Sequence, residues 1–226
     1  MFVRVHSRRR PTVPWATAAV AAACVVAFLA LGTFTDTERS AMLSTWGVVP
    51  DVLLGPAWAA GDPLAARPAT LLTSLLLHAD WLHLSGNVLF LLILGFAAER
   101  ALGPLRFLGL FLACGAIANV AGAWVLSGGS APIVGASGAV SAIVGAWLAL
   151  FPRANLGLVL PLGLYLEFVR VPAPLLIGFW VLLQVAFSLV DPAFGKVAWS
   201  VHLAGFALGA AFALVSRPAL ARRQRG

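Results

Sequence analysis

Three polar side chains that could carry out nucleophilic chemistry interrupt long apolar stretches of this chain: His83, Ser137 and His202. A serine hydroxyl is a weak nucleophile until a base removes its proton, and a neutral imidazole can do so near neutral pH. On a helix, Asn87 would lie on the same face as His83, about one turn further along. These residue types predict a serine–histidine pair with extra hydrogen-bond donors for a developing oxyanion.

The composition indicates which solvent surrounds these residues. The chain is 61% hydrophobic and 10% charged, whereas an average soluble domain is roughly 45–50% apolar and about 25% charged. A soluble protein of 226 residues could not bury so much apolar surface. The chain is therefore predicted to be an integral membrane protein in contact with the lipid bilayer.

The net charge of +7 does not indicate nucleic-acid binding, because of where the charges lie. Arg8, Arg9 and Arg10 precede the first apolar run, and a second arginine group at 217–225 follows the last. Basic residues beside membrane spans usually set topology. We therefore expect no nucleic-acid partner.

Six apolar segments predict an all-α, polytopic membrane bundle of six transmembrane helices. They cover residues 15–34, 75–98, 107–126, 137–151, 174–190 and 199–215. The first segment could also be the apolar region of a signal peptide, but its length of about 20 residues favours a retained helix. The expected organisation is a basic tail at 1–14, the membrane domain at 15–216 and a basic tail at 217–226.

The distribution of lysine and arginine predicts the orientation. With the N-terminus inside, twelve of the fifteen fall on the cytoplasmic side, and Arg39, Arg67 and Lys196 fall outside. This bias predicts cytoplasmic N- and C-termini. The expected location is a bacterial cytoplasmic membrane, which the chain crosses several times.

The helical rise of about 1.5 Å per residue places the three reactive side chains at a common depth. His83 and Ser137 each lie sixteen residues, about 24 Å, before the first charge at the inner end of their segments. His202 lies fifteen residues, about 22 Å, before Arg217. All three are expected in the outer half of a hydrocarbon core roughly 30 Å thick, and this coincidence favours one shared site.

The segment that begins at Ser137 is too short for a full crossing. About fifteen residues span some 22 Å, so this helix must begin below the outer surface. Residues 127–134 would dip in from outside, and irregular backbone persists there only where protein surrounds it or water reaches it. A wet cavity is expected around Ser137, beside the positive end of a helix dipole. Because only Asp80, higher up, is acidic nearby, a Ser–His dyad without a carboxylate is predicted.

Other interpretations of single residues stay open. Taken alone, Ser137 would more simply be a small residue for close helix packing, like Ser141 and Gly145 on the same face. His78 and His83 are five residues apart and would point to different sides of a helix, which disfavours a metal pair. No metal or cofactor is predicted. Two further polar residues in apolar segments are interpreted as interhelical hydrogen-bonding groups: Asn119 and Gln184.

These residues resemble the signature of the rhomboid family of intramembrane serine proteases. Residues 135–138, Gly-Ala-Ser-Gly, are similar to the family's G-x-S-G nucleophile motif. Its H-x4-H-x3-N and H-x2-G-x3-G patterns occur in the second and sixth segments. They consist of His78, His83 and Asn87, and of His202, Gly205 and Gly209. The likeness covers about residues 46–216.

The resemblance implies a serine endopeptidase that hydrolyses peptide bonds in or near the transmembrane segments of membrane-protein substrates. By that likeness Ser137 attacks, and His202 is first the general base and then the general acid. The oxyanion would be supported by His83, Asn87 and the backbone N–H of Ser137. The remaining members of the motifs would have supporting roles: His78, Gly135 and Gly138. The fifth segment with residues 191–198 is similar to the family's substrate gate.

Two departures from the family pattern concern positioning. Many members have a tyrosine four residues after the serine, stacked on the catalytic histidine, where this chain has Ser141. Some members have a Trp-Arg pair in the first outer loop, whereas in this chain only Arg67 is available for that position. The competing hypothesis is a catalytically silent rhomboid-like protein that binds transmembrane segments. It predicts loss of Ser137 or His202, and both are present.

Overall fold

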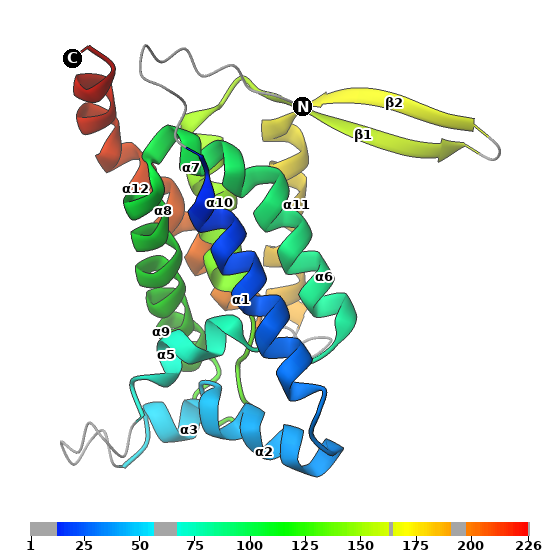
Figure 1. Cartoon of the computed structure of the whole chain (residues 1–226), viewed down its shortest axis with the longest axis vertical. Coiled ribbons are helices and arrows are strands. Elements are labelled where there is room, and N and C mark those ends of the chain that lie inside the picture. The colour runs from blue at the N-terminus through cyan, green and yellow to red at the C-terminus, as the bar shows by residue number, and fades with distance from the viewer. Residues whose placement is uncertain (1–12, 57–66, 163–164, 191–197, 226) are drawn as a thin grey trace.

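A computed structural model describes residues 13–56, 67–162, 165–190 and 198–225 as a bundle of helices (Figure 1). The helices of the first half are α1 (Trp15–Leu31), α2 (Asp36–Trp46), α3 (Pro50–Leu53), α5 (Thr70–Thr73), η1 (Ser74–Leu76), α6 (Trp81–Phe90), η2 (Leu91–Gly95) and α7 (Phe96–Leu102). The second half comprises α8 (Pro104–Gly109), η3 (Leu110–Cys114), α9 (Gly115–Val125), α10 (Ser137–Leu150), β1 (Asn155–Leu162), β2 (Tyr165–Pro172), α11 (Ala173–Val190) and α12 (Trp199–Arg225).

The bundle confirms the all-α prediction. Within the described residues, four helical stretches are long and apolar enough to cross a membrane: Trp81–Leu102, Pro104–Val125, Ala173–Val190 and Trp199–Arg217. Two shorter apolar helices, α1 and α10, complete the bundle. The start of α1 and the end of α12 lie at the same end of it (Figure 1).

The chain between α10 and α11 folds differently from the helical bundle. β1 and β2 form an antiparallel hairpin whose register runs from Asn155 opposite Pro172 to Leu162 opposite Tyr165. It projects sideways from the end of the bundle where α11 begins (Figure 1). The hairpin is an addition that hydropathy did not predict.

The second membrane helix begins later than predicted, at Trp81 instead of residue 75. Asp80 is its N-cap, and the carboxylate accepts a hydrogen bond from the backbone N–H of His83 at 2.8 Å. An aspartate at this position satisfies a backbone donor that would otherwise lack a partner, which favours a helix start. His78 therefore lies in the connection before the helix.

Helix α10 occupies the centre of the bundle. Ten consecutive residues, Gly138–Trp147, are buried on all sides, as expected for a helix surrounded by others. Small residues let α12 approach it closely. A Cβ atom on Gly209 would lie 2.6 Å from the Cα atom of Ala142, and one on Gly205 would lie 3.3 Å from the Cα atom of Gly138. Helices α10 and α12 therefore run parallel to each other, with their backbones in direct contact.

A buried carboxylate joins α1 and α7. The side chain of Glu99 in α7 is 1% exposed. It accepts hydrogen bonds from the backbone N–H groups of Ala16 and Thr17, at 2.9 and 2.7 Å, and from the Thr17 hydroxyl at 2.7 Å. Because these amides begin α1, Glu99 caps that helix from outside it and lies at its positive end.

We expect Glu99→Leu to lower the free energy of unfolding by about 2–4 kcal/mol, because it leaves three buried donors without an acceptor. Thermal unfolding in detergent micelles measures the change. Glu38→Gln is the control, since Glu38 also caps a helix but is exposed; hydrogen bonds from the backbone N–H and hydroxyl of Thr35 hold its pKa below the usual range. Equal melting temperatures for wild type and Glu99→Leu would contradict this role.

Candidate active site

Ser137 is the first residue of α10, where backbone N–H groups have no acceptor one turn earlier. The preceding bend depends on Gly135, whose φ of +118° disfavours other residues. A Cβ atom at Gly135 would also lie 2.5 Å from Nε2 of His83. The imidazole of His83 therefore packs against the bend that leads to Ser137.

The loop before Ser137 is held by protein backbone at both ends. Val48 and Ile133 exchange backbone hydrogen bonds of 3.0 and 2.7 Å. The N–H of Gly135 donates to the carbonyl of Ser74 at 2.9 Å. These bonds give irregular backbone the partners that it needs within a membrane.

His78 supports the same loop from the connection before α6. It is fully buried, and its Nδ1 lies 3.2 Å from the carbonyl oxygen of Leu76. A carbonyl can only accept, so Nδ1 carries the proton and Nε2 accepts from the N–H of Ala136 at 3.5 Å. His78 thus links this connection to the residue before Ser137.

The prediction that His78 and His83 point apart was wrong in its premise. It placed both on one helix, but His78 precedes α6, and the two rings meet edge to face with centroids 5.2 Å apart. Within the described ranges, no group of three or more His, Cys, Asp and Glu side chains is placed to hold a metal ion.

Asn87 is 7% exposed, and its side-chain amide donates to the carbonyl of His83 at 2.9 Å. One amide proton is therefore used within α6, and the second is left for another acceptor. The structure brings His83 to the bend at Gly135, whereas the oxyanion role of Asn87 stays a prediction.

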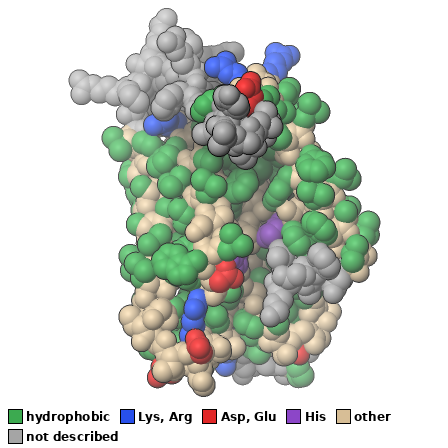
Figure 2. Space-filling model, turned by 90° about the vertical axis from the view of Figure 1, so that its right-hand side faces the viewer, with side chains coloured by type: hydrophobic (Ala, Val, Ile, Leu, Met, Phe, Trp, Pro, Cys, Tyr) green, Lys and Arg blue, Asp and Glu red, His purple; other side chains and the backbone are tan. Residues whose placement is uncertain are grey.

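His202 lies near the start of α12, at the level of Ser137. The adjacent Val201 is the contact residue, since a Cβ atom on Gly138 would lie 2.6 Å from its Cγ1. Among the described residues, Ser137 and His202 are not hydrogen-bonded to each other, and such bonds are often long in unliganded enzymes. Histidine side chains are visible between hydrophobic ones on one face of the molecule (Figure 2).

Most of the chain also matches the model of a known protein family. The rhomboid domain matches residues 65–219, which is more than half of the chain. The chain belongs to the rhomboid family. A similar protein is the "Putative rhomboid protease YdcA" of Bacillus subtilis (strain 168), which is 38% identical over 78 residues. That stretch covers 34% of this chain and 39% of the relative, so it spans about two fifths of the relative's length.

Two intramembrane amides of this rhomboid protein have different partners. Asn119 donates to the carbonyl of Leu71 at 3.3 Å and to the hydroxyl of Ser74 at 3.0 Å, as an interhelical group. Gln184 in α11 accepts at 2.9 Å from Nδ1 of His202. Sequence reasoning found Gln184 as a polar residue in an apolar segment but could not identify its partner.

The position of the family's frequent tyrosine is taken by Ser141, which is 3% exposed in the core of the bundle. An aromatic ring contacts His202 from a different position, because Trp199 lies edge-on to it at a centroid distance of 5.9 Å.

Arg67, in the predicted first outer loop, has a positive φ of 51°, and its carbonyl accepts a hydrogen bond from the hydroxyl of Thr70. The proposed gate residues 191–197 and loop residues 57–66 fall outside the described ranges.

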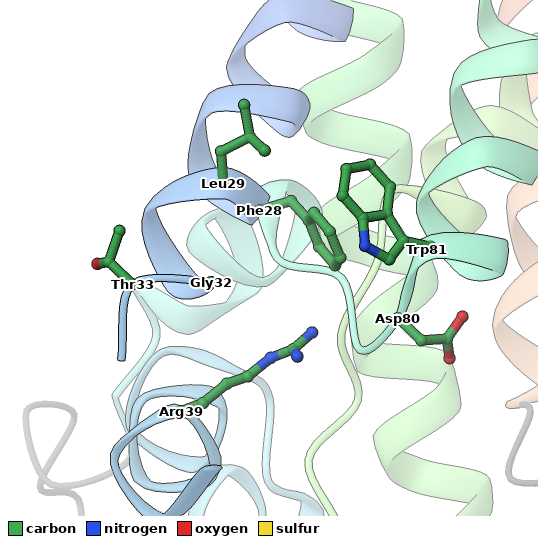
Figure 3. Close-up of a pocket in the computed structure, with 7 residues that line it drawn as sticks. All are labelled: Phe28, Leu29, Gly32, Thr33, Arg39, Asp80 and Trp81. Carbon is green, nitrogen blue, oxygen red and sulfur yellow. The ribbon is translucent and has the colours of Figure 1, made fainter. Parts of the chain in front are cut away.

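A cavity of about 420 Å³ lies between α1, α2 and the start of α6, and its lining does not include His83, Ser137 or His202 (Figure 3). The guanidinium of Arg39 donates to the carbonyl of Ala79 and lies 5.3 Å from the ring centre of Phe28. Phe28 and Trp81 stack edge to face at 4.6 Å. The contact of Arg39 with Ala79 holds the connection that carries His78.

Proposed function

We propose that this rhomboid protein is an intramembrane serine endopeptidase that hydrolyses peptide bonds in or near the transmembrane segments of membrane proteins. The observation that carries the proposal is the meeting of three helices at one level. α6 supplies His83 against Gly135, α10 begins at Ser137, and α12 supplies His202 beside the contact of Val201 with Gly138.

The chemistry follows from these side chains. The Ser137 hydroxyl attacks the scissile carbonyl carbon while Nε2 of His202 takes its proton. The tetrahedral intermediate expels the amine, which receives that proton from His202, and an acyl-enzyme remains. Water then attacks the ester carbonyl while His202 takes one of its protons, and His202 returns that proton to the Ser137 oxygen as the carbon–oxygen bond breaks and the acid product leaves.

Negative charge on the carbonyl oxygen needs donors during both attacks. The backbone N–H of Ser137 and the positive end of α10 provide fixed ones. His83 and the free amide proton of Asn87 are proposed as the side-chain donors. The bend at Gly135 and the close contact at Gly138 position these groups, and His78 supports the bend.

For the membrane arrangement we propose six crossings with both termini in the cytoplasm, a membrane domain at 15–216 between basic tails at 1–14 and 217–226, and a bacterial cytoplasmic membrane. The start of α1 and the end of α12 lie at the same end of the bundle, and this supports an even number of membrane crossings (Figure 1). Arg217, the first residue of the proposed C-terminal tail, donates a hydrogen bond to the carbonyl of Ala149 at the end of α10.

Labelling with a fluorophosphonate probe in lipid nanodiscs tests the activation of Ser137. The wild type is expected to react, whereas Ser137→Ala and His202→Ala are not. Ser141→Ala is the matched control, since it removes a buried serine one turn away and should keep the label. A folded wild type that neither reacts nor cleaves transmembrane substrates would favour the silent, segment-binding alternative.

A further inference from the structure

Gln184 is the one polar side chain among the three buried residues of α11, beside Ala173 and Ile177. It is 5% exposed, and its Oε1 lies 2.9 Å from Nδ1 of His202. The side chain thus extends from an apolar helix to the imidazole of the proposed catalytic base. We propose that Gln184 is a positioning residue that fixes the orientation and tautomer of His202, an inference that rests on the proposed function.

The chemistry of the hydrogen bond determines the tautomer. An amide oxygen only accepts, so Nδ1 of His202 must be the protonated ring nitrogen. A neutral imidazole has one N–H, and Nε2 therefore keeps its lone pair. This is the nitrogen that must accept the proton of Ser137. The opposite tautomer would present an N–H to the serine and could not act as its base.

The surroundings of His202 explain why this bond matters. Trp199 touches one edge of the ring, and Ser141 stands where other rhomboid proteases are expected to stack a tyrosine. Within the described ranges no carboxylate is hydrogen-bonded to His202. A neutral amide performs the orienting task without the cost of placing a charge inside the membrane.

The location of Gln184 links His202 to the packing of α11. Among the four long helices, α11 buries the smallest share of its residues inside the bundle. A shift of α11 away from α12 would remove the acceptor from Nδ1. The alignment of the base therefore depends on the docking of this peripheral helix.

Steady-state cleavage of a transmembrane substrate in proteoliposomes tests the proposal. Gln184→Leu keeps the approximate volume but removes the acceptor, and we expect kcat to fall about 10- to 100-fold with KM changed less than about twofold. Gln184→Glu keeps an oxygen acceptor and should recover most of the rate. Ser188→Ala, one turn away on α11, is the matched control and should behave as wild type. Unchanged kcat in folded Gln184→Leu would overturn the proposal.

A spectroscopic measurement separates this proposal from the proposed function. In protein with ¹⁵N-labelled histidine, His202 of the wild type should give the signals of an Nδ1-protonated ring, and Gln184→Leu should populate both tautomers. Gln184→Met serves if the leucine variant does not fold. The signals do not require turnover, so an inactive wild type with this tautomer would contradict only the protease assignment. An Nε2-protonated His202 in the wild type would overturn the role of Gln184.

Discussion

Replacing Ser137 and His202 together is expected to slow peptide-bond hydrolysis no more than replacing Ser137 alone. Residues that act as one unit have strongly non-additive effects, because the base has no task without its nucleophile. Each single alanine variant should lower kcat by about 10⁴-fold or more. Single-turnover cleavage of a transmembrane substrate in proteoliposomes, with enzyme in excess, measures all three variants.

The comparison needs two safeguards. Ser141→Ala should cleave at nearly the wild-type rate, since its hydroxyl lies in the core of the bundle. The melting temperature of Ser137→Ala should match the wild type, because Ser137 is partly exposed, whereas that of His202→Ala should be somewhat lower, because the buried Gln184 loses its hydrogen-bond partner. A double variant far slower than either single variant would mean that the two residues act independently and would contradict the dyad.

Gly209→Ala is expected to destabilise the protein by about 2–3 kcal/mol or more. The added Cβ would lie 2.6 Å from the Cα atom of Ala142, and a backbone atom cannot rotate away as a side chain can. α10 is enclosed on all sides, so α12 must move outward, and this would also displace His202. Thermal unfolding and cleavage rate should therefore fall together.

Gly178→Ala is the matched control for this prediction. Gly178 lies in the interior of α11, and a Cβ atom there would meet no atom within 4 Å. Alanine favours a helix over glycine by about 0.5–1 kcal/mol, so this variant should be as stable as the wild type or slightly more so. Similar losses in both variants would show that contact with α10 is not the cause.

Several features of the site could be predicted from local sequence. Apolar runs located most helix ends to within a few residues, since the bilayer sets their length, but the start of α6 and the end of α12 lay further from the prediction. Counting residues along the helical rise placed His83, Ser137 and His202 at one depth. Two glycines four residues apart, Gly205 and Gly209, have the spacing that favours a close helix contact. Each of these inferences uses a regularity that the chain carries within a single helix.

Other features required information that hydropathy does not contain. The start of α6 depends on the Asp80 cap, which overrode an apolar run that begins six residues earlier. The same cap moved His78 off the helix and allowed its contact with Ala136. The β1–β2 hairpin was not predicted, because Glu167 and Arg170 in β2 are three residues apart and do not give the two-residue alternation that indicates a strand.

The sequence by itself determined that the chain is a membrane protein, which residue types could react, and that they lie at a common level of the bundle. Only the tertiary structure decided that Gln184 meets His202, that Glu99 caps α1, and that α12 packs on α10. The physical reason is that hydrophobic periodicity and residue composition describe each helix separately. A hydrogen-bond partner in a membrane is chosen by which helices pack together and how each is rotated, and that choice depends on the whole bundle.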